Sequence, residues 1–103
     1  MRRAFSPATL ASLREMPSED ALALLATYCK ADLTYVPFKD PSSRRWHGRT
    51  SCGEFELLTT GPKWWDSRAG KGGGGAIDLA MHLLDLSFVD AVRLLIECGP
   101  QRG

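Results

Sequence analysis

Residues 70–95 read GKGGGGAIDLAMHLLDLSFVDAVRLL, so a run of glycines leads directly into a helical pattern. Two adjacent tryptophans, Trp64 and Trp65, precede that run. Each glycine costs roughly 0.5–1 kcal/mol relative to alanine in regular structure, so a run needs a physical reason. Two explanations stay open: the backbone binds a phosphate at the helix N-terminus, or it passes close beneath the tryptophans.

The residues after the glycines predict two consecutive helices. Apolar residues recur at helical spacing through both segments: Ile77, Ala80, Met81, Leu84, Phe88, Val92, Leu95 and Ile96. Four of them are expected to be buried: Ile77, Leu84, Val92 and Leu95. Ser87 is placed to cap the second helix, with Asp90 at its N3 position. Gly99 and Pro100 then end it.

Upstream of the tryptophans, the pattern changes from helix to strand. Ser6 and Pro7 predict the start of one short helix, and Ser18 predicts the cap of a second that continues to about Lys30. Alternation and turn residues predict strands over 33–38, 45–51, 54–60 and 63–67, with a turn at Gly61-Pro62. The fold class is therefore α+β: a small antiparallel sheet flanked by N-terminal and C-terminal helices, in one domain over 1–103.

Composition is that of an ordinary globular protein with one modest core. The chain has 103 residues, of which 44% are hydrophobic and 24% charged, and no apolar run reaches the length of a membrane span. Its three cysteines, Cys29, Cys52 and Cys98, suit neither a disulfide framework nor a Cys-x-x-Cys knuckle. We expect reduced, buried thiols in a cytoplasmic protein without a membrane partner.

The net charge of +1 conceals an uneven distribution. Between Lys39 and Lys71 there are seven basic and four acidic residues, and all three tryptophans lie in the same segment. Interleaved basic and aromatic residues favour a polyanion whose bases stack, although an aromatic core with a solvated basic face is the alternative. The candidate contact residues are Arg44, Arg45, Arg49, Lys63, Trp64, Trp65, Arg68 and Lys71.

Neighbouring strand residues point to opposite faces of a sheet. One of Trp64 and Trp65 is therefore expected in the core, with the other facing outward among the basic residues.

No enzyme motif accompanies these residues. The glycine run formally satisfies G-x-G-x-x-G, but no further strand follows to complete a dinucleotide-binding unit, and Lys71 precedes glycine rather than Ser or Thr of a P-loop. Paired acids for nucleotidyl transfer and a recognisable nucleophile motif are also missing. The sequence predicts a binding domain without a cofactor rather than an enzyme.

Two segments resemble a known family. YVPFKDPSSRRW, followed by KWWDSRAGKGGGGAIDLAMHLLDLSFVDAVRLL, is similar to the CHC2-type zinc-binding domain of bacterial and phage DNA primases. The specific matches are AID at 76–78 and LSFVDAV at 86–92, and the resemblance extends from about Ser18 onward. It implies a zinc-ribbon-like sheet that holds single-stranded DNA template for a primase or replication system of a plasmid, phage or integrative element.

The family's zinc ligands are missing from this sequence. Their positions fall at Val36, Lys39, Ser67 and Gly70, none of which is a zinc ligand. Neither His47 nor His82 has a partner at ligand spacing. The resemblance therefore implies a zinc-less version, held by aromatic packing from the tryptophans and Phe38 with at least one tryptophan buried.

The loss of zinc also leaves a second function open. In this alternative function, the domain docks a helicase, polymerase or primase subunit through its acidic C-terminal helices.

Overall fold

The computed structural model describes residues 5–37 and 40–98. It confirms the α+β class, since two helices precede and two follow a five-stranded antiparallel sheet. The elements, in chain order, are α1 (Pro7–Glu15), α2 (Ser18–Leu25), β1 (Tyr28–Ala31), β2 (Arg44–Thr50), β3 (Gly53–Thr60), β4 (Lys63–Asp66), β5 (Lys71–Gly73), α3 (Ala76–Leu84) and α4 (Phe88–Cys98). The likeness to a zinc ribbon stays a prediction.

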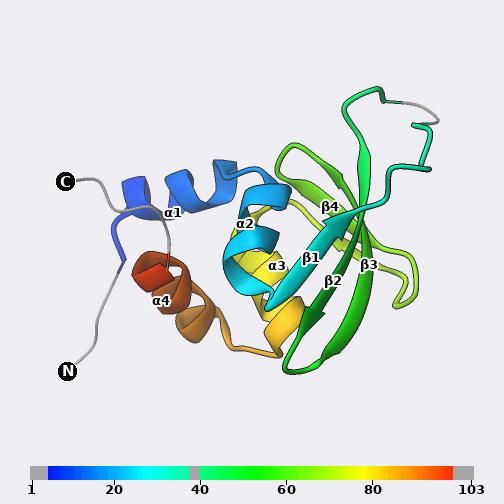
Figure 1. The fold of residues 1–103 in the computed structure, drawn as a ribbon. Coiled ribbons are helices and arrows are strands. Elements are labelled where there is room, and N and C mark those ends of the chain that lie inside the picture. Colours follow the sequence, from blue (N-terminus) through cyan, green and yellow to red (C-terminus); the bar gives the residue numbers. More distant parts are fainter. Residues whose placement is uncertain (1–4, 38–39, 99–103) are drawn as a thin grey trace.

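The strands follow one another across the sheet in the order β1-β2-β3-β4-β5, each antiparallel to the next. All four helices lie on one side of this sheet (Figure 1). Burial alternates along β4, where Trp64 and Asp66 are buried whereas Lys63 and Trp65 are exposed. The sheet therefore has one face against the helices and one face that the described helices leave open.

Helices and sheet share a single core. Its buried apolar residues are Leu13, Ala21, Leu22, Leu25, Leu57, Trp64, Ala76, Ile77, Leu79, Ala80, Leu83, Ala91, Val92 and Leu95. Every helix contributes to this set, as do β3 and β4. The sheet therefore contributes to the core through the face that is turned toward the helices.

The two N-terminal helices begin in different ways. As predicted, Ser6 caps α1, because its hydroxyl accepts a hydrogen bond from the Thr9 amide at 3.1 Å. The predicted cap at Ser18 is wrong, since Pro17 is the N-cap of α2. Ser18 is instead fully buried, and its hydroxyl donates to the Pro62 carbonyl at 2.7 Å. This bond ties α2 to the turn between β3 and β4.

The predicted helix to Lys30 and the predicted strand over 33–38 are both wrong. Helix α2 ends at Leu25, and the Thr27 amide donates to the carbonyl of Arg49, which aligns β1 with β2. Beyond β1, Asp32 Oδ1 accepts from the Thr34 amide and hydroxyl, so the chain turns where alternation predicted strand. Val36, which belongs to the predicted strand over 33–38, lies in this loop, and Phe38 lies outside the described residues.

The closing helices match their predicted capping and most of their burial. Ser87 Oγ accepts from the Asp90 amide at 3.2 Å, as predicted, while the expected stop at Gly99 and Pro100 lies outside the described residues. Leu84 is only half-buried, because its neighbour Leu83 takes the core position at 0% exposure. Other predicted members of the apolar faces are also less buried than expected: Met81, Phe88 and Ile96.

The glycine run is explained by the tryptophans beside it. A Cβ at Gly73 would lie 2.8 Å from the Trp64 indole, and one at Gly72 would lie 2.7 Å from the Trp65 ring. Both distances are shorter than side chains tolerate, so β5 needs glycine at both positions. Gly70, with φ +67°, supplies the left-handed residue that closes the β4–β5 turn. Close passage beside the tryptophans therefore accounts for Gly72 and Gly73, and the left-handed conformation accounts for Gly70.

Replacing Leu83 with alanine should lower the free energy of unfolding by about 2–5 kcal/mol, the usual cost of such a cavity. Leu84→Ala should cost clearly less, since its side chain is only half-buried. Urea unfolding at constant m-value measures both. Equal losses for the two variants would contradict the orientation of α3.

Gly73→Ala should destabilise the protein by about 1–3 kcal/mol, because the added methyl group collides with the Trp64 ring. Gly74→Ala is the matched control, since a Cβ there has nothing within 4 Å. Thermal unfolding of both variants separates the effects. A Gly73→Ala protein as stable as the Gly74→Ala protein would refute the packing explanation of the glycines.

Candidate nucleic-acid interface

The sheet face turned away from the helices is the candidate interface, and it is called the open face here. Alternation along the strands and the strand register place eleven side chains on it: Tyr28, Lys30, Arg45, His47, Arg49, Glu54, Glu56, Leu58, Thr60, Lys63 and Trp65. Tyr28 and Trp65 are 49% and 46% exposed, so two large aromatic rings on this face are in contact with solvent. Exposed aromatic rings on a sheet face are suited to stacking against bases.

The two adjacent tryptophans have opposite environments. Trp64 is buried among the helices, where its ring stacks on His82 at 4.9 Å between centroids. Trp65 points to the open face and packs one part of its ring against Gly72. Because the Gly72 backbone supports it, the Trp65 ring is held outward with much of its surface free.

Trp64 itself is anchored by a buried polar network. His82 lies 2.7 Å from Asp66 through Nε2 and Oδ2, and Asp66 Oδ1 accepts from the amides of Arg68 and Ala69. These bonds hold β4 against α3 and shape the turn that follows. His82 is thus a packing histidine, and it positions the strand that carries Trp65.

Most arginines of the open face are already ion-paired. Arg45 contacts Asp32 through Nε and Nη2, both at 2.9 Å, and approaches Glu56 at 3.5 Å. Arg49 pairs with Glu54 at 2.9 Å. These pairs neutralise the two arginines, so Arg45 and Arg49 contribute less charge to recognition than the sequence composition suggested.

Two candidate residues are less tightly paired. Arg68 has one long contact, with Nε 3.8 Å from Glu56, and its side chain is 61% exposed. Lys63 has no ion pair among the described residues, although its charge helps to lower the pKa of Asp40 after the hydrogen bonds from Ser42. These are the basic groups most available to a phosphate beside Trp65.

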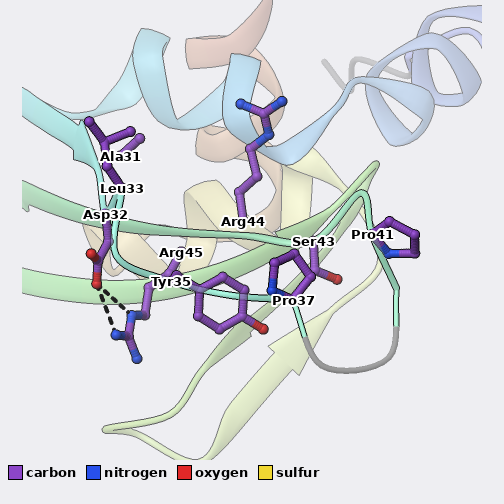
Figure 2. Close-up of a pocket in the computed structure, with 9 residues that line it drawn as sticks. All are labelled: Ala31, Asp32, Leu33, Tyr35, Pro37, Pro41, Ser43, Arg44 and Arg45. Atoms are coloured by element: carbon purple, nitrogen blue, oxygen red, sulfur yellow. Dashed lines mark hydrogen bonds and ion pairs between the residues drawn. The ribbon is translucent and has the colours of Figure 1, made fainter.

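The predicted set does not share a single face. Figure 2 shows Arg44 and Arg45 leaving their strand in opposite directions, with Arg44 toward the helices. Lys71 also lies on the helix side, because it pairs in register with buried Asp66 and lines a groove beside Trp64. Arg44, Lys71 and Trp64 are therefore excluded from the open face, whereas the other five candidates lie on it or beside it.

Asp32 organises one end of this face. Hydrogen bonds from the Thr34 hydroxyl and amide, followed by the bond from Arg45, hold the pKa of Asp32 well below its usual range. The carboxylate therefore stays ionised across the physiological pH range. Sequence reasoning missed this residue because its partners come from a local turn and from a neighbouring strand.

The positions that correspond to zinc ligands in the resembled family do not form a site. Val36 is 78% exposed in the β1–β2 loop, Ser67 and Gly70 lie in the β4–β5 turn, and Lys39 is outside the described residues. None offers a thiolate, imidazole or carboxylate. These residues do not fit zinc.

A different group of metal-type ligands occurs on the open face. Within residues 5–37 and 40–98, the one such group found comprises Asp32, His47 and Glu56. His47 Nε2 lies 3.7 Å from Asp32 and 3.9 Å from Glu56. Arg45 Nε, however, contacts both of those carboxylates. A guanidinium among the three ligands repels a cation, so the geometry favours an ion-pair network over a metal centre.

Two further expectations concern thiols and membranes. Cys29 is half-buried and Cys52 is exposed in the β2–β3 hairpin, so the expectation of buried thiols is wrong for Cys52. Among the described helices, none is both long and apolar enough to cross a bilayer.

Comparison with known proteins found no match: no family model, curated protein or solved structure is significantly similar to this chain. Function has to be argued from the site itself.

Asp32→Asn should destabilise the protein at pH 7, because the ionised carboxylate holds both Thr34 and Arg45. The folded pKa of Asp32 is lowered, so its stabilising contribution is complete above the unfolded pKa of about 3.9 and declines as the pH falls below it. The difference in thermal midpoint between wild type and variant should thus shrink below about pH 4. Glu15→Gln on α1 is the control, and an equal difference at all pH values would contradict the assignment.

Proposed function

We propose that the open face binds single-stranded DNA, with Trp65 stacking on a base. The observation that carries this proposal is the half-exposed Trp65 ring, supported from below by Gly72 on a sheet face that the described helices leave uncovered. An exposed ring on an uncovered sheet face offers a flat surface on which a base can stack. Stacking needs no fixed donor or acceptor, so such binding tolerates many sequences.

Charge on the face supports the same ligand, in a secondary role. Lys63 stands two residues before Trp65 on β4, and Arg68 follows in the next turn with a single long ion pair. Both are within reach of phosphates that flank a stacked base. Because Arg45 and Arg49 are already paired, we expect moderate affinity led by stacking rather than by charge.

The resemblance to primase zinc-binding domains supplies a context for this activity. We infer a cytoplasmic accessory domain of a primase or replication system of a plasmid, phage or integrative element. In that role the domain holds template and performs no chemistry of its own. Any nucleotidyl transfer belongs to another segment or a partner protein.

Trp65→Ala should weaken single-strand binding by about 1–3 kcal/mol, the usual value for one stacked base. That loss corresponds to roughly a 5- to 150-fold higher Kd. Trp65→Phe should retain part of the affinity, because a smaller ring still stacks. Fluorescence anisotropy with a labelled oligonucleotide at low salt measures the Kd of wild type and of both variants. Thermal unfolding confirms that each protein is folded.

Salt dependence tests the charged part of the same proposal. Removing one phosphate contact should lower the slope of log K against log salt by about 0.7 on single strands, so Lys63→Ala should reduce it by this amount. Arg93→Ala on α4 removes an exposed basic residue on the helix side and should leave the slope unchanged. Equal slopes for wild type, Lys63→Ala and Arg93→Ala would show that Lys63 contacts no phosphate.

A second candidate function rests on α4. Its outward side exposes Phe88, Val89 and Ile96 by 38–44%, and exposed apolar residues gathered on one helix are typical of protein contacts. In this alternative the domain docks a helicase, polymerase or primase subunit through the C-terminal helices. Loss of partner binding in Val89→Asp, with single-strand binding retained, would support docking as an additional activity.

A further inference from the structure

A pocket of about 260 Å³ lies where the β1–β2 loop curves beside the start of β2. Strand β1 ends at Ala31, and no residue of β1 pairs with Arg44 or Arg45. Beyond β1, the Asp32 amide donates to the Arg45 carbonyl at 2.8 Å, and the loop then leaves the edge of β2. Figure 2 shows the loop bending around the first residues of β2, with the rings of Tyr35, Pro37 and Pro41 among the pocket walls.

The Tyr35 ring is held in place before any ligand binds. Its amide donates to the Asp32 carbonyl at 3.2 Å, and its ring lies 5.3 Å from the guanidinium carbon of Arg45. Arg45 is in turn fixed by Asp32, whose other oxygen accepts from Thr34. A ring fixed in this way loses little conformational entropy on binding.

Three polar side chains of the pocket are already engaged with partners: Ser43, Asp32 and Arg45. Ser43 Oγ pairs with the Thr60 hydroxyl at 2.7 Å, and Asp32 and Arg45 hold each other. Arg44 is exposed and has no ion pair within the described residues, and its side chain extends from the pocket wall toward the helices (Figure 2). The pocket thus offers ring surfaces to a flat group, and the guanidinium of Arg44 lies on the other side of the sheet.

We propose, on the basis of the single-strand binding inferred above, that this pocket holds a second base of the same strand. The base lies against the Tyr35 ring. Arg45, Leu58 and Trp65 occupy matching positions on three adjacent strands, so Arg45, whose guanidinium lies beside the Tyr35 ring, is about two strand spacings, roughly 10 Å, from Trp65. One short oligonucleotide reaches both sites.

This assignment favours nucleic acid over a peptide for a specific reason. A peptide in the pocket would present backbone amides and carbonyls that need partners, whereas Ser43, Asp32 and Arg45 are already occupied. A base meets this surface with its flat face, and its polar edge stays in water. We therefore expect little discrimination between bases in this pocket.

Binding of oligothymidylates of increasing length tests the second base site. Wild type should gain affinity when the oligonucleotide becomes long enough to reach from Trp65 to Tyr35, whereas Tyr35→Ala should lose that gain, roughly 5- to 100-fold. Tyr35→Phe keeps the ring and should bind within about twofold of wild type. Arg44→Ala, on the helix side, should leave the salt slope unchanged.

Each possible outcome bears on a distinct claim. A weakened Trp65→Ala protein beside an unaffected, folded Tyr35→Ala protein would overturn the pocket proposal and leave the proposed function standing. Absence of wild-type binding at low salt would overturn the proposed function itself. Crosslinking with 5-iodouracil oligonucleotides, followed by peptide mapping, should modify the segment that contains Tyr35 in wild type. Protection of Tyr35 by a proline-rich peptide alone, with no such crosslink, would assign the pocket to a protein ligand instead.

Discussion

The contact between two tryptophans and two glycines determines how this protein presents its sheet. Trp64 occupies the space that a side chain at Gly73 would need, and Trp65 does the same above Gly72. Since adjacent strand residues face opposite ways, the same pair of contacts places one ring in the core and the other on the open face. β5 can lie against β4 only because positions 72 and 73 are both glycine.

The rest of the interface follows from the way this contact is anchored. His82 stacks on Trp64 and bonds Asp66, and Asp66 also holds the amides of the next turn. These interactions fix β4 between α3 and the open face. Ring stacking, a buried Asp–His bond and glycine packing together hold this segment in place.

Electrostatics on the open face differ from what composition alone suggests. Arg45 and Arg49 lie on the face, but acidic residues from the preceding loop and the neighbouring strand neutralise them. Such pairs are worth little stability individually, yet they fix the geometry of Tyr35 and leave Lys63 and Arg68 as the more available cations. The proposed binding therefore depends on rings held in place more than on net charge.

Features set by local sequence could be predicted, and features set by distant partners could not. The caps at Ser6 and Ser87 and the opposite orientations of Trp64 and Trp65 follow from short-range rules, and the structure confirms them. The α2–β1 boundary depended on pairing with Arg49, more than twenty residues away.

The helix face, the loop and the sheet face that were predicted wrongly have separate causes. Leu83 replaced Leu84 in the core because packing by other elements sets the rotation of a short helix. The loop after β1 follows from an Asp32 turn that competes with an alternating strand pattern. Arg44 and Lys71 left the predicted face because strand register, which the sequence did not specify, assigns them to the helix side.

The most direct test of the central claim is an NMR titration of the ¹⁵N-labelled protein with a short single-stranded oligonucleotide. The three indole N–H signals report separately on the tryptophans. The indole signal of Trp65 and the amides of β2, β3 and β4 should shift, whereas the signal of buried Trp64 and the amides of α4 should stay in place. An unchanged Trp65 signal, with shifts confined to α4, would contradict the claim that the open face binds the strand.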